Sequence, residues 1–208
     1  MQLILISNPE NFCCEHELLQ KLFNAGLEYF HLRKPGYSIE DYINYIELVP
    51  EKYHKNIVVH NYIDLYSEYN LKGIHFSRHN KYRINEFEQA VIQKSISAHS
   101  FDELLNLQEF NYAFLSPVYN SISKKNYKSM FNPEEIAKFF KRNILDTRVI
   151  ALGGISYENT EKTLLIGFDG VAVMGSLWNN YFVEKNIETT VRYFIELNKK
   201  CQQFVRMY

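Results

Sequence analysis

Hydrophobic and polar positions form two alternating patterns along the chain. Short apolar runs, typical of buried parallel strands, are separated by segments whose apolar residues recur at helical spacing. The runs predict eight strands, at Leu3–Ile6, Tyr29–Leu32, Ile57–His60, Gly73–Phe76, Ser95–His99, Tyr112–Leu115, Val149–Leu152 and Gly170–Val173. The other segments predict eight helices, at Glu15–Asn24, Ile39–Leu48, Ile63–Tyr69, Ile84–Ile92, Phe101–Leu107, Pro133–Phe140, Glu158–Ile166 and Glu184–Asn198. Strict alternation favours an α/β fold of the (β/α)8 TIM-barrel type, with a doubly wound open sheet as the alternative.

Several predicted helices begin with recognisable capping residues. Ser38 precedes the second helix with Asp41 three positions later, which is a capping pattern. Ser100 stands before the fifth helix. Asn132 is followed by Pro133 at a first helical position, where the missing N–H of proline costs nothing. These signals support the predicted starts.

The composition restricts the class of protein. The chain has 208 residues, 46% of them hydrophobic, and a net charge of −1, so we expect one TIM-barrel domain over residues 1–208. Near-neutral charge argues against a nucleic-acid surface, and no apolar run is long enough to span a membrane. Three cysteines without a CxxC pair suit a reducing compartment, so a cytoplasmic location is expected. Some of the 16 tyrosines and 15 phenylalanines are expected at a homo-oligomer face.

Glycines follow the last two predicted strands. Gly153-Gly154 comes directly after the seventh strand, and Gly175-Ser176 comes shortly after the eighth. Bare backbone N–H groups at the start of a helix bind phosphate, and TIM barrels frequently bind phosphate at these two strand ends. The alternative is that the glycines only make a tight turn. Their position favours a site for phosphorylated small-molecule substrates.

Charged and imidazole groups follow the second strand. Arg33 and Lys34 are placed to bring a cation to the barrel mouth, where Arg binds an anion through two hydrogen bonds. The alternative is an exposed charge pair before a turn. His31 lies two residues before Arg33 and therefore on the same face of the strand, which predicts that it points into the barrel. An inward histidine is more often structural than catalytic.

Polar residues also follow the third, fourth and fifth strands. His60 and Asn61 end the third strand, and the segment His75–Asn80 follows the fourth. Amide oxygens are weak ligands for Mg²⁺. The histidines could suit a softer metal, but the spacing of His60, His75 and His79 matches no zinc signature, so no tight metal site is expected. Ser97 on the fifth strand is a candidate hydrogen-bond donor to a ligand. Neither a Walker loop nor a GxGxxG fingerprint is present in the sequence.

The segment Tyr119–Phe131 is polar and basic and follows the sixth strand. It carries Ser121, Ser123 and Lys124. Because loops at the carboxyl ends of barrel strands build the sites of TIM barrels, a ligand flap is one interpretation. A solvated surface loop is the other.

Seven motifs in a fixed order resemble those of the thiamine phosphate synthase (thiamine-phosphate pyrophosphorylase)/TenI family. They are Phe30–Lys34, Val58–Leu65, Lys72–Phe76, Ile96–Ser100, Leu115–Lys124, Ile150–Ile155 and Gly167–Met174. The resemblance implies a (β/α)8 barrel acting in thiamine biosynthesis. It implies a transferase that couples hydroxymethylpyrimidine diphosphate to thiazole phosphate and releases pyrophosphate with the help of Mg²⁺.

The resemblance also implies residue roles. Arg33 would hold the diphosphate and Lys124 would assist its departure. Hydrogen bonds to the substrates would come from Ser97, Ser121 and Ser123, with His60 and Asn61 nearby. The thiazole phosphate would lie against Gly153, Gly154, Gly175 and Ser176.

The chain departs from the family at several site positions. Asn61 and Asn80 stand where synthases have the two aspartates that bind Mg²⁺, and Pro35 stands at a lysine position. His31 replaces a glutamine and is more similar to the TenI branch. Two alternatives therefore stay open beside synthase coupling. One is a TenI-like thiazole tautomerase that uses His31 or His60 as proton carrier, and the other is a non-catalytic binder of a thiamine-pathway phosphate.

Overall fold

Eight parallel strands close into a barrel in their chain order. The computed structural model describes residues 2–87, 92–120 and 131–203. Each strand pairs with its neighbours in sequence, and β8 pairs with β1 to close the ring. The strands are β1 Gln2–Ile6, β2 Phe30–Leu32, β3 Ile57–Val59, β4 Gly73–Phe76, β5 Gln93–Ala98, β6 Tyr112–Leu115, β7 Arg148–Leu152 and β8 Gly170–Val173. The TIM-barrel prediction is confirmed, and every predicted strand is found within two residues of its expected ends.

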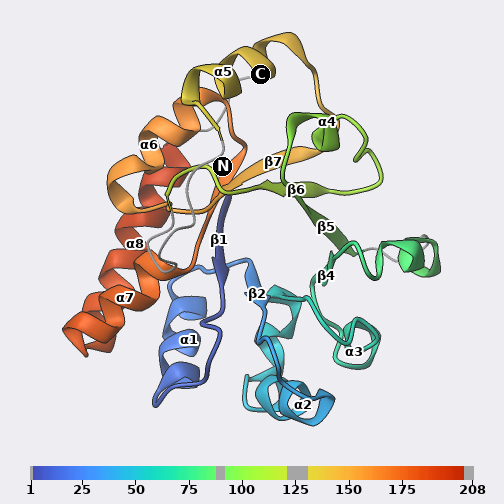
Figure 1. Ribbon diagram of the computed structural model, residues 1–208. Coiled ribbons are helices and arrows are strands. Elements are labelled where there is room, and N and C mark those ends of the chain that lie inside the picture. Colours follow the sequence, from blue (N-terminus) through green and yellow to red (C-terminus); the bar gives the residue numbers. More distant parts are fainter. Residues whose placement is uncertain (1, 88–91, 121–130, 204–208) are drawn as a thin grey trace.

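Helices surround the strands on the outside (Figure 1). They are α1 Glu15–Asn24, α2 Ile39–Glu47, α3 Leu65–Glu68, α4 Phe101–Leu104, α5 Pro133–Arg142, α6 Tyr157–Ile166, α7 Gly175–Glu184 and α8 Ile187–Gln203, with 3-10 turns η1 Glu51–Asn56 and η2 Lys81–Phe87. The predicted caps form. The Ser38 hydroxyl accepts a hydrogen bond from the Asp41 N–H (3.2 Å), and the Asp41 carboxylate accepts one from the Ser38 N–H (2.9 Å).

Four predicted helices differ from the structure, and one of them, the fifth, was expected at Phe101–Leu107 but ends at Leu104. The third is a single turn, Leu65–Glu68, and the region of the fourth forms a 3-10 helix up to Phe87, with residues 88–91 outside the described part of the chain. The segment after β8 holds two helices instead of one. Lys185 adopts the left-handed conformation (φ 47°) and ends α7, and Asn186 accepts a hydrogen bond from the Thr189 N–H (3.0 Å) at the start of α8.

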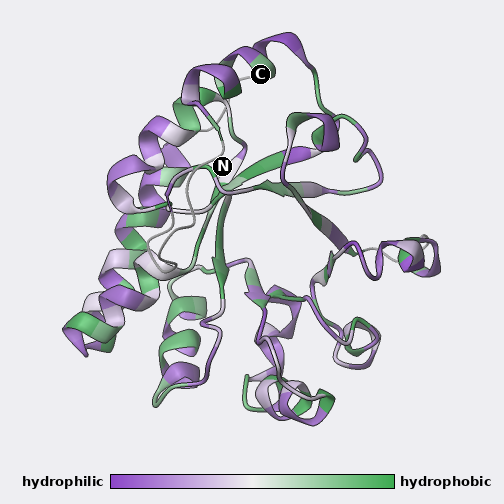
Figure 2. Cartoon of the chain, viewed as in Figure 1, coloured by the Kyte–Doolittle hydropathy of each residue, from purple (hydrophilic) through white to green (hydrophobic). Residues whose placement is uncertain are grey.

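Alternation along the strands separates two cores. Phe30 and Leu32 of β2 are fully buried against the surrounding helices, whereas His31 between them points into the barrel. Figure 2 shows the hydrophobic residues along the strands and on the strand-facing sides of the helices. Most of the apolar core therefore lies between the barrel and its helices, and a smaller core fills the barrel interior.

The barrel interior is itself divided into an apolar and a polar part. Aliphatic side chains of β1, β7 and β8 meet Phe114 of β6 in one cluster. The inward positions of β2, β4 and β5 carry His31, His75, Ser95 and Ser97. His75 hydrogen-bonds to both serines, and His31 hydrogen-bonds to the Tyr112 hydroxyl. Burying polar groups is costly unless they are paired, so this part of the interior is a candidate for function.

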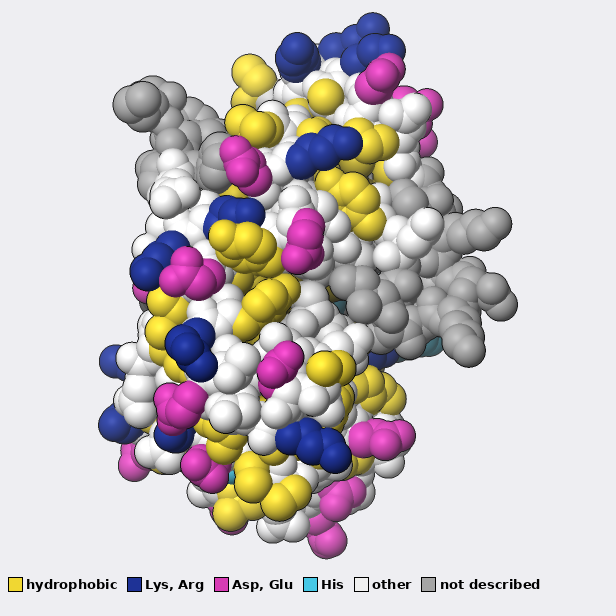
Figure 3. Space-filling model, turned by 90° about the vertical axis from the view of Figure 1, so that its left-hand side faces the viewer, with side chains coloured by type: hydrophobic (Ala, Val, Ile, Leu, Met, Phe, Trp, Pro, Cys, Tyr) yellow, Lys and Arg dark blue, Asp and Glu magenta, His cyan; other side chains and the backbone are white. Residues whose placement is uncertain are grey.

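The outer face formed by α6, α7 and α8 carries acidic, basic and hydrophobic side chains intermixed (Figure 3). Such mixing gives this face no field of a single sign, in agreement with the near-neutral charge of the chain. Among the described residues, no helix has the length and apolar character needed to cross a bilayer.

Candidate active site

A pocket of about 640 Å³ opens at the carboxyl ends of β2 to β5. Its lining residues are Arg33, Pro35, His60, Asn61, His75, Phe76, Ser77, Arg78, His79, Ile96, Ser97 and His99. None of these described residues is Asp or Glu, whereas two are arginines. A concave site at this end of a TIM barrel is the usual place for substrate binding, and its charge here favours an anion.

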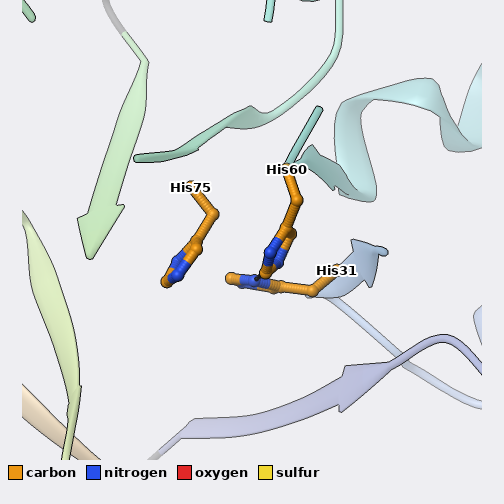
Figure 4. A group of neighbouring side chains, drawn as sticks. All are labelled: His31, His60 and His75. Carbon is orange, nitrogen blue, oxygen red and sulfur yellow. Dashed lines mark hydrogen bonds between the residues drawn. The ribbon is translucent and has the colours of Figure 1, made fainter. Parts of the chain in front are cut away.

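Three imidazoles lie side by side at the base of this region (Figure 4), and two of them, His60 and His75, line the pocket. His31 comes from β2, His60 directly follows β3, and His75 belongs to β4, so neighbouring strands bring them together. His31 Nδ1 and His60 Nε2 are 3.0 Å apart, and the rings of His60 and His75 are stacked with centroids 4.2 Å apart. The prediction that His31 points into the barrel is confirmed.

Hydrogen bonds extend this histidine cluster (His31, His60 and His75) across the barrel interior. His31 Nε2 lies 2.7 Å from the Tyr112 hydroxyl of β6. His75 Nδ1 lies 2.9 Å from the Ser95 hydroxyl, and its Nε2 lies 3.1 Å from that of Ser97. The Ser95 hydroxyl also hydrogen-bonds to Tyr112. Burial raises the pKa of the Tyr112 phenol, and this hydrogen bond offsets part of that rise.

Burial keeps the three imidazoles neutral. It lowers the pKa of His31 and His60 well below the usual value, and the neighbouring His75 adds to both shifts. The pKa of His75 falls to about 3, first because of burial and then because of the positive charge of Arg33. Near neutral pH, the cluster therefore accepts or donates hydrogen bonds without carrying a charge.

Arg33 is held at the rim by its backbone. Its N–H donates to the Ser7 hydroxyl (2.9 Å), which in turn donates to the Arg33 carbonyl (2.9 Å). Because the side chain itself is exposed at the pocket, it can meet a ligand without first losing a buried partner. The predicted placement of a cation at the barrel mouth is confirmed for Arg33.

Lys34, the next residue, contradicts both sequence interpretations of this pair. It is buried (1% exposed) and its Nζ contacts both carboxylate oxygens of Glu15, at 2.7 and 2.8 Å. Glu15 also accepts a hydrogen bond from the Tyr45 hydroxyl (2.9 Å). Successive residues of an extended segment point in opposite directions, so Lys34 anchors the loop to α1 and α2 while Arg33 faces the pocket.

The described residues do not fit a protein-held Mg²⁺ ion. Asn80 Oδ1 already accepts hydrogen bonds from the backbone N–H (2.6 Å) and hydroxyl (3.1 Å) of Ser77. Asn61 is exposed at the rim, and the pocket lining contains no carboxylate among its described members. Mg²⁺ prefers hard, charged oxygen ligands, and neutral imidazoles do not replace them.

The glycines after β7 are required by the local structure. Gly153 and Gly154 have φ values of +99° and +65°, where side chains are disfavoured. A Cβ on Gly154 would lie 2.3 Å from the Asn120 carbonyl oxygen, and one on Gly153 would lie 2.9 Å from Pro117 Cα. The tight-turn interpretation therefore accounts for both glycines, whether or not a phosphate binds there.

The helices after β7 and β8 differ in whether side chains of the chain itself form hydrogen bonds at their amino termini. Strand pairing places the ends of β7 and β8 side by side, with Leu152 opposite Ala172. At α6, the Ser156 N–H donates to Asn159 Oδ1 (2.9 Å) and its hydroxyl donates to the Glu158 carboxylate (2.5 Å). That helix end is occupied by its own side chains, one of them negatively charged.

The start of α7 has no side-chain cap, because its N-cap residue is Met174. Ser176 follows in the first turn, and its hydroxyl oxygen is buried without a hydrogen-bond partner among the described residues. The Tyr193 hydroxyl makes a weak contact with Ser176 that acts to lower the Tyr193 pKa, which burial raises overall, but this contact does not meet the geometry of a hydrogen bond. A buried hydroxyl without a partner at the positive end of a helix is a hydrogen-bond donor that an anionic oxygen could use.

The remaining predicted residues divide into two groups. Ser97 lies in the pocket, where it contacts His75. Ser121, Ser123 and Lys124 lie outside the described residues, so their predicted contacts with substrate stay predictions.

The sequence did not single out the participation of Tyr112, Ser95 and Arg78 in this site. The first two are inward positions of β6 and β5, which alternation makes recognisable once the barrel is known. Arg78 follows β4 and lines the pocket, where Glu103 pairs with it at 2.8 Å.

Comparisons with known proteins agree with this geometry. The sequence model of the family described as thiamine monophosphate synthase matches residues 3–177. The chain is 33% identical to a thiamine phosphate pyrophosphorylase from Bacteroides thetaiotaomicron, whose crystal structure superposes with a TM-score of 0.84 over 99% of this chain and 100% of the other. It is 25% identical to the thiamine-phosphate synthase of Staphylococcus haemolyticus, over 86% of this chain and 88% of the relative. A pyrophosphorylase from Pyrococcus furiosus, at 16% identity and a TM-score of 0.78, shares the fold over 99% of this chain and 97% of its own.

Proposed function

The chain belongs to the thiamine monophosphate synthase family, and we propose that it couples hydroxymethylpyrimidine diphosphate to thiazole phosphate. The products are thiamine phosphate and pyrophosphate. One observation carries the assignment to this pocket: among described residues, two arginines and no carboxylate line it, which suits a diphosphate. The family and the names of the relatives favour this transfer over the tautomerase and the non-catalytic binder.

The proposed reaction exchanges one bond for another. The bond between the pyrimidine methylene carbon and the diphosphate oxygen breaks, and the diphosphate leaves with the electron pair. The thiazole nitrogen then donates its lone pair to the methylene carbon and becomes positively charged. No proton is gained or lost at the reacting atoms, so the protein has to stabilise the departing charge and align two rings.

The diphosphate is assigned to the side of the pocket formed after β2 to β5. Arg33 is the main candidate for binding its oxygens through two parallel hydrogen bonds. Arg78 adds a second positive group at this rim, partly offset by Glu103. Ser97 and His60 supply hydrogen bonds at the floor, and Lys124 is proposed to assist departure on the strength of the family resemblance.

The thiazole phosphate is assigned to the ends of β7 and β8. The uncapped start of α7 and the unpaired Ser176 hydroxyl support placing an anion there, with the Gly175 backbone beside it. The Gly153-Gly154 turn shapes the neighbouring wall. The occupied start of α6, with Glu158 beside it, is the poorer place for an anion.

The proposal has three further parts: the metal ion, the location and the oligomeric state. Mg²⁺ belongs to it only as an ion brought by the diphosphate, whose own oxygens are good ligands. A cytoplasmic location is proposed because the three cysteines are free thiols. A homo-oligomer stays a prediction.

Pyrophosphate release tests the proposal directly. The purified chain is incubated with both substrates, and pyrophosphate is measured with and without each of them. We expect release only when both are present, together with thiamine phosphate in equal amount. No product, combined with a thiazole phosphate that still raises the melting temperature, would support the binder instead. Isomerisation of a thiazole ligand that is lost in His31→Ala or His60→Ala would support the tautomerase.

A further inference from the structure

We propose that His31, His60 and His75 form a binding site for a divalent transition-metal ion of the Zn²⁺ class. The site lies at the floor of the pocket and is separate from the two asparagines at the Mg²⁺ positions of the family. One ring nitrogen from each histidine lies within 4.8 Å of the other two. Figure 4 shows the three side chains converging from β2, the end of β3, and β4.

The separation of two of the nitrogens already approaches that of a metal site. His31 Nδ1 and His60 Nε2 are 3.0 Å apart and share one hydrogen bond. Two imidazole nitrogens bound to a tetrahedral Zn²⁺ ion at about 2.05 Å are about 3.3 Å apart. An ion can therefore take the place of this hydrogen bond with little movement of the two rings, once the donor imidazole carries its proton on its other ring nitrogen. His75 is farther away and stacked on His60, so it has to turn toward them for binding.

Hydrogen bonds on the outer nitrogens orient the rings as in known metal sites. His31 Nε2 contacts the Tyr112 hydroxyl (2.7 Å), which leaves Nδ1 facing His60. Both nitrogens of His75 contact serine hydroxyls in the present ring position, so a serine lies within reach of the nitrogen that faces away from an ion. Such outer partners fix the ring orientation of metal-binding histidines and raise their basicity.

The chemistry of the donors selects the class of ion. Three neutral nitrogen ligands suit Zn²⁺, Co²⁺ or Ni²⁺ and suit Mg²⁺ poorly. Imidazoles must be unprotonated to bind a metal, and burial keeps these three neutral.

His60 and His75 also line the pocket, so a fourth coordination position would face it, as in catalytic zinc sites. An oxygen of a phosphorylated ligand is the expected occupant, and this last assignment rests on the proposed function.

Cobalt binding tests the site without requiring turnover. Cys13 and Cys14 are exposed, with their Sγ atoms 3.3 Å apart, and would bind metal themselves, so the parent protein carries Cys13→Ser and Cys14→Ser. The full chain is stripped with a chelator and titrated with Co²⁺, and the visible absorption of the ion is recorded. We expect one-to-one binding with the intense bands of tetrahedral coordination.

Two variants in this parent separate a metal site from incidental binding. His60→Gln should weaken Co²⁺ binding by about 100-fold or more, because one of three ligands is lost. The matched control is His79→Gln, since His79 lines the same pocket outside the histidine cluster and should bind Co²⁺ as the parent does. Tyr112→Phe keeps all three ligands and should bind about 10–100-fold more weakly. Far-UV circular dichroism checks that each variant is folded.

Equal binding by the parent and His60→Gln would overturn the site, as would the absence of saturable binding in the parent. If His60→Gln does not fold, Tyr112→Phe takes its place, and undiminished affinity there would overturn the site. Pyrophosphate release is measured separately on the same parent. Release without Co²⁺ binding overturns the metal site alone, whereas Co²⁺ binding without release overturns the proposed function alone.

Discussion

The two ends of the proposed active site offer different groups to an anion. After β2 to β5, the pocket is built from side chains, with Arg33 at the rim, His60 and His75 at the floor, and His31 buried beneath them. After β7 and β8, it is built from backbone and one hydroxyl, at the uncapped start of α7. Parallel strands place both ends at the same mouth of the barrel. One barrel thus offers a titratable site and a fixed site to two phosphorylated substrates.

The difference has a physical consequence. A helix terminus and a serine hydroxyl keep their character across the ordinary pH range, so the β7–β8 end should bind phosphate with little dependence on the protein's own charge. The β2–β5 end holds imidazoles whose neutrality depends on burial and on Arg33. A substitution or a pH change that alters ligand binding at one end should therefore leave ligand binding at the other end unchanged.

The largest effect is expected at the buried ion pair behind the β2–β5 end. Glu15→Gln leaves the Lys34 ammonium buried without a counter-charge and should lower the free energy of unfolding by about 3–5 kcal/mol. Urea unfolding measures it, with Glu17→Gln as control, because Glu17 is exposed in the same helix and should change stability by less than about 0.5 kcal/mol. Equal changes in the free energy of unfolding for the two substitutions would show that the buried ion pair does not stabilise the fold.

Removing the exposed cation should affect activity rather than stability. Arg33→Gln should lower kcat/KM by about 10²–10³-fold, since it removes charged donors to the departing diphosphate. The fold should persist, because Ser7 holds the Arg33 backbone and not its side chain. Arg148→Gln, at the amino end of β7, is the matched control. A similar loss in both variants would place the diphosphate elsewhere.

Lowering the pH should lower the free energy of unfolding of the chain because of the histidine cluster at the β2–β5 end. In chelator-treated protein, folding lowers the pKa of His31, His60 and His75, so below about pH 6.5 the unfolded chain binds protons that the folded chain does not. The free energy of unfolding then falls as the pH drops, by up to about 1.4 kcal/mol per pH unit for each histidine, and for His75 until about pH 3. His75→Asn should show the shallower dependence in urea unfolding. Parallel curves would contradict the assigned pKa shift.

The smallest effect is expected at the β7–β8 end. Ser176→Ala should raise KM for the thiazole phosphate about tenfold, equal to about 1.4 kcal/mol. It should leave stability unchanged or slightly higher, because a buried hydroxyl without a partner is removed. Steady-state kinetics with each substrate varied in turn would show it. A rise in KM for the diphosphate substrate instead would reverse the assignment of the two ends.

The sequence predicted the barrel because each strand carries its own apolar signal between turn residues. It did not predict α7, since Met174 at its start is not a capping residue and gives no sign of a helix terminus. The third helix was predicted too long because the apolar residues that suggested Ile63–Tyr69 pack around a single turn, Leu65–Glu68. Local patterns therefore give strands reliably and short helices less so.

Site residues could be predicted from the sequence where their position directly after a strand was enough to place them. Arg33 and the glycines follow their strands directly, and the structure places them at strand ends as expected. The histidine cluster was not predictable, because it depends on the stagger between β2, β3 and β4, which spacing along the chain does not contain. The burial of Lys34 depends on Glu15, 19 residues earlier in another element.

A crystal structure with thiamine phosphate and pyrophosphate bound tests the central claim most directly. We expect pyrophosphate against Arg33 above the histidine cluster, and the phosphate of thiamine phosphate against the Ser176 hydroxyl and the first turn of α7. Pyrophosphate at the ends of β7 and β8, or both ligands outside the barrel mouth, would contradict it.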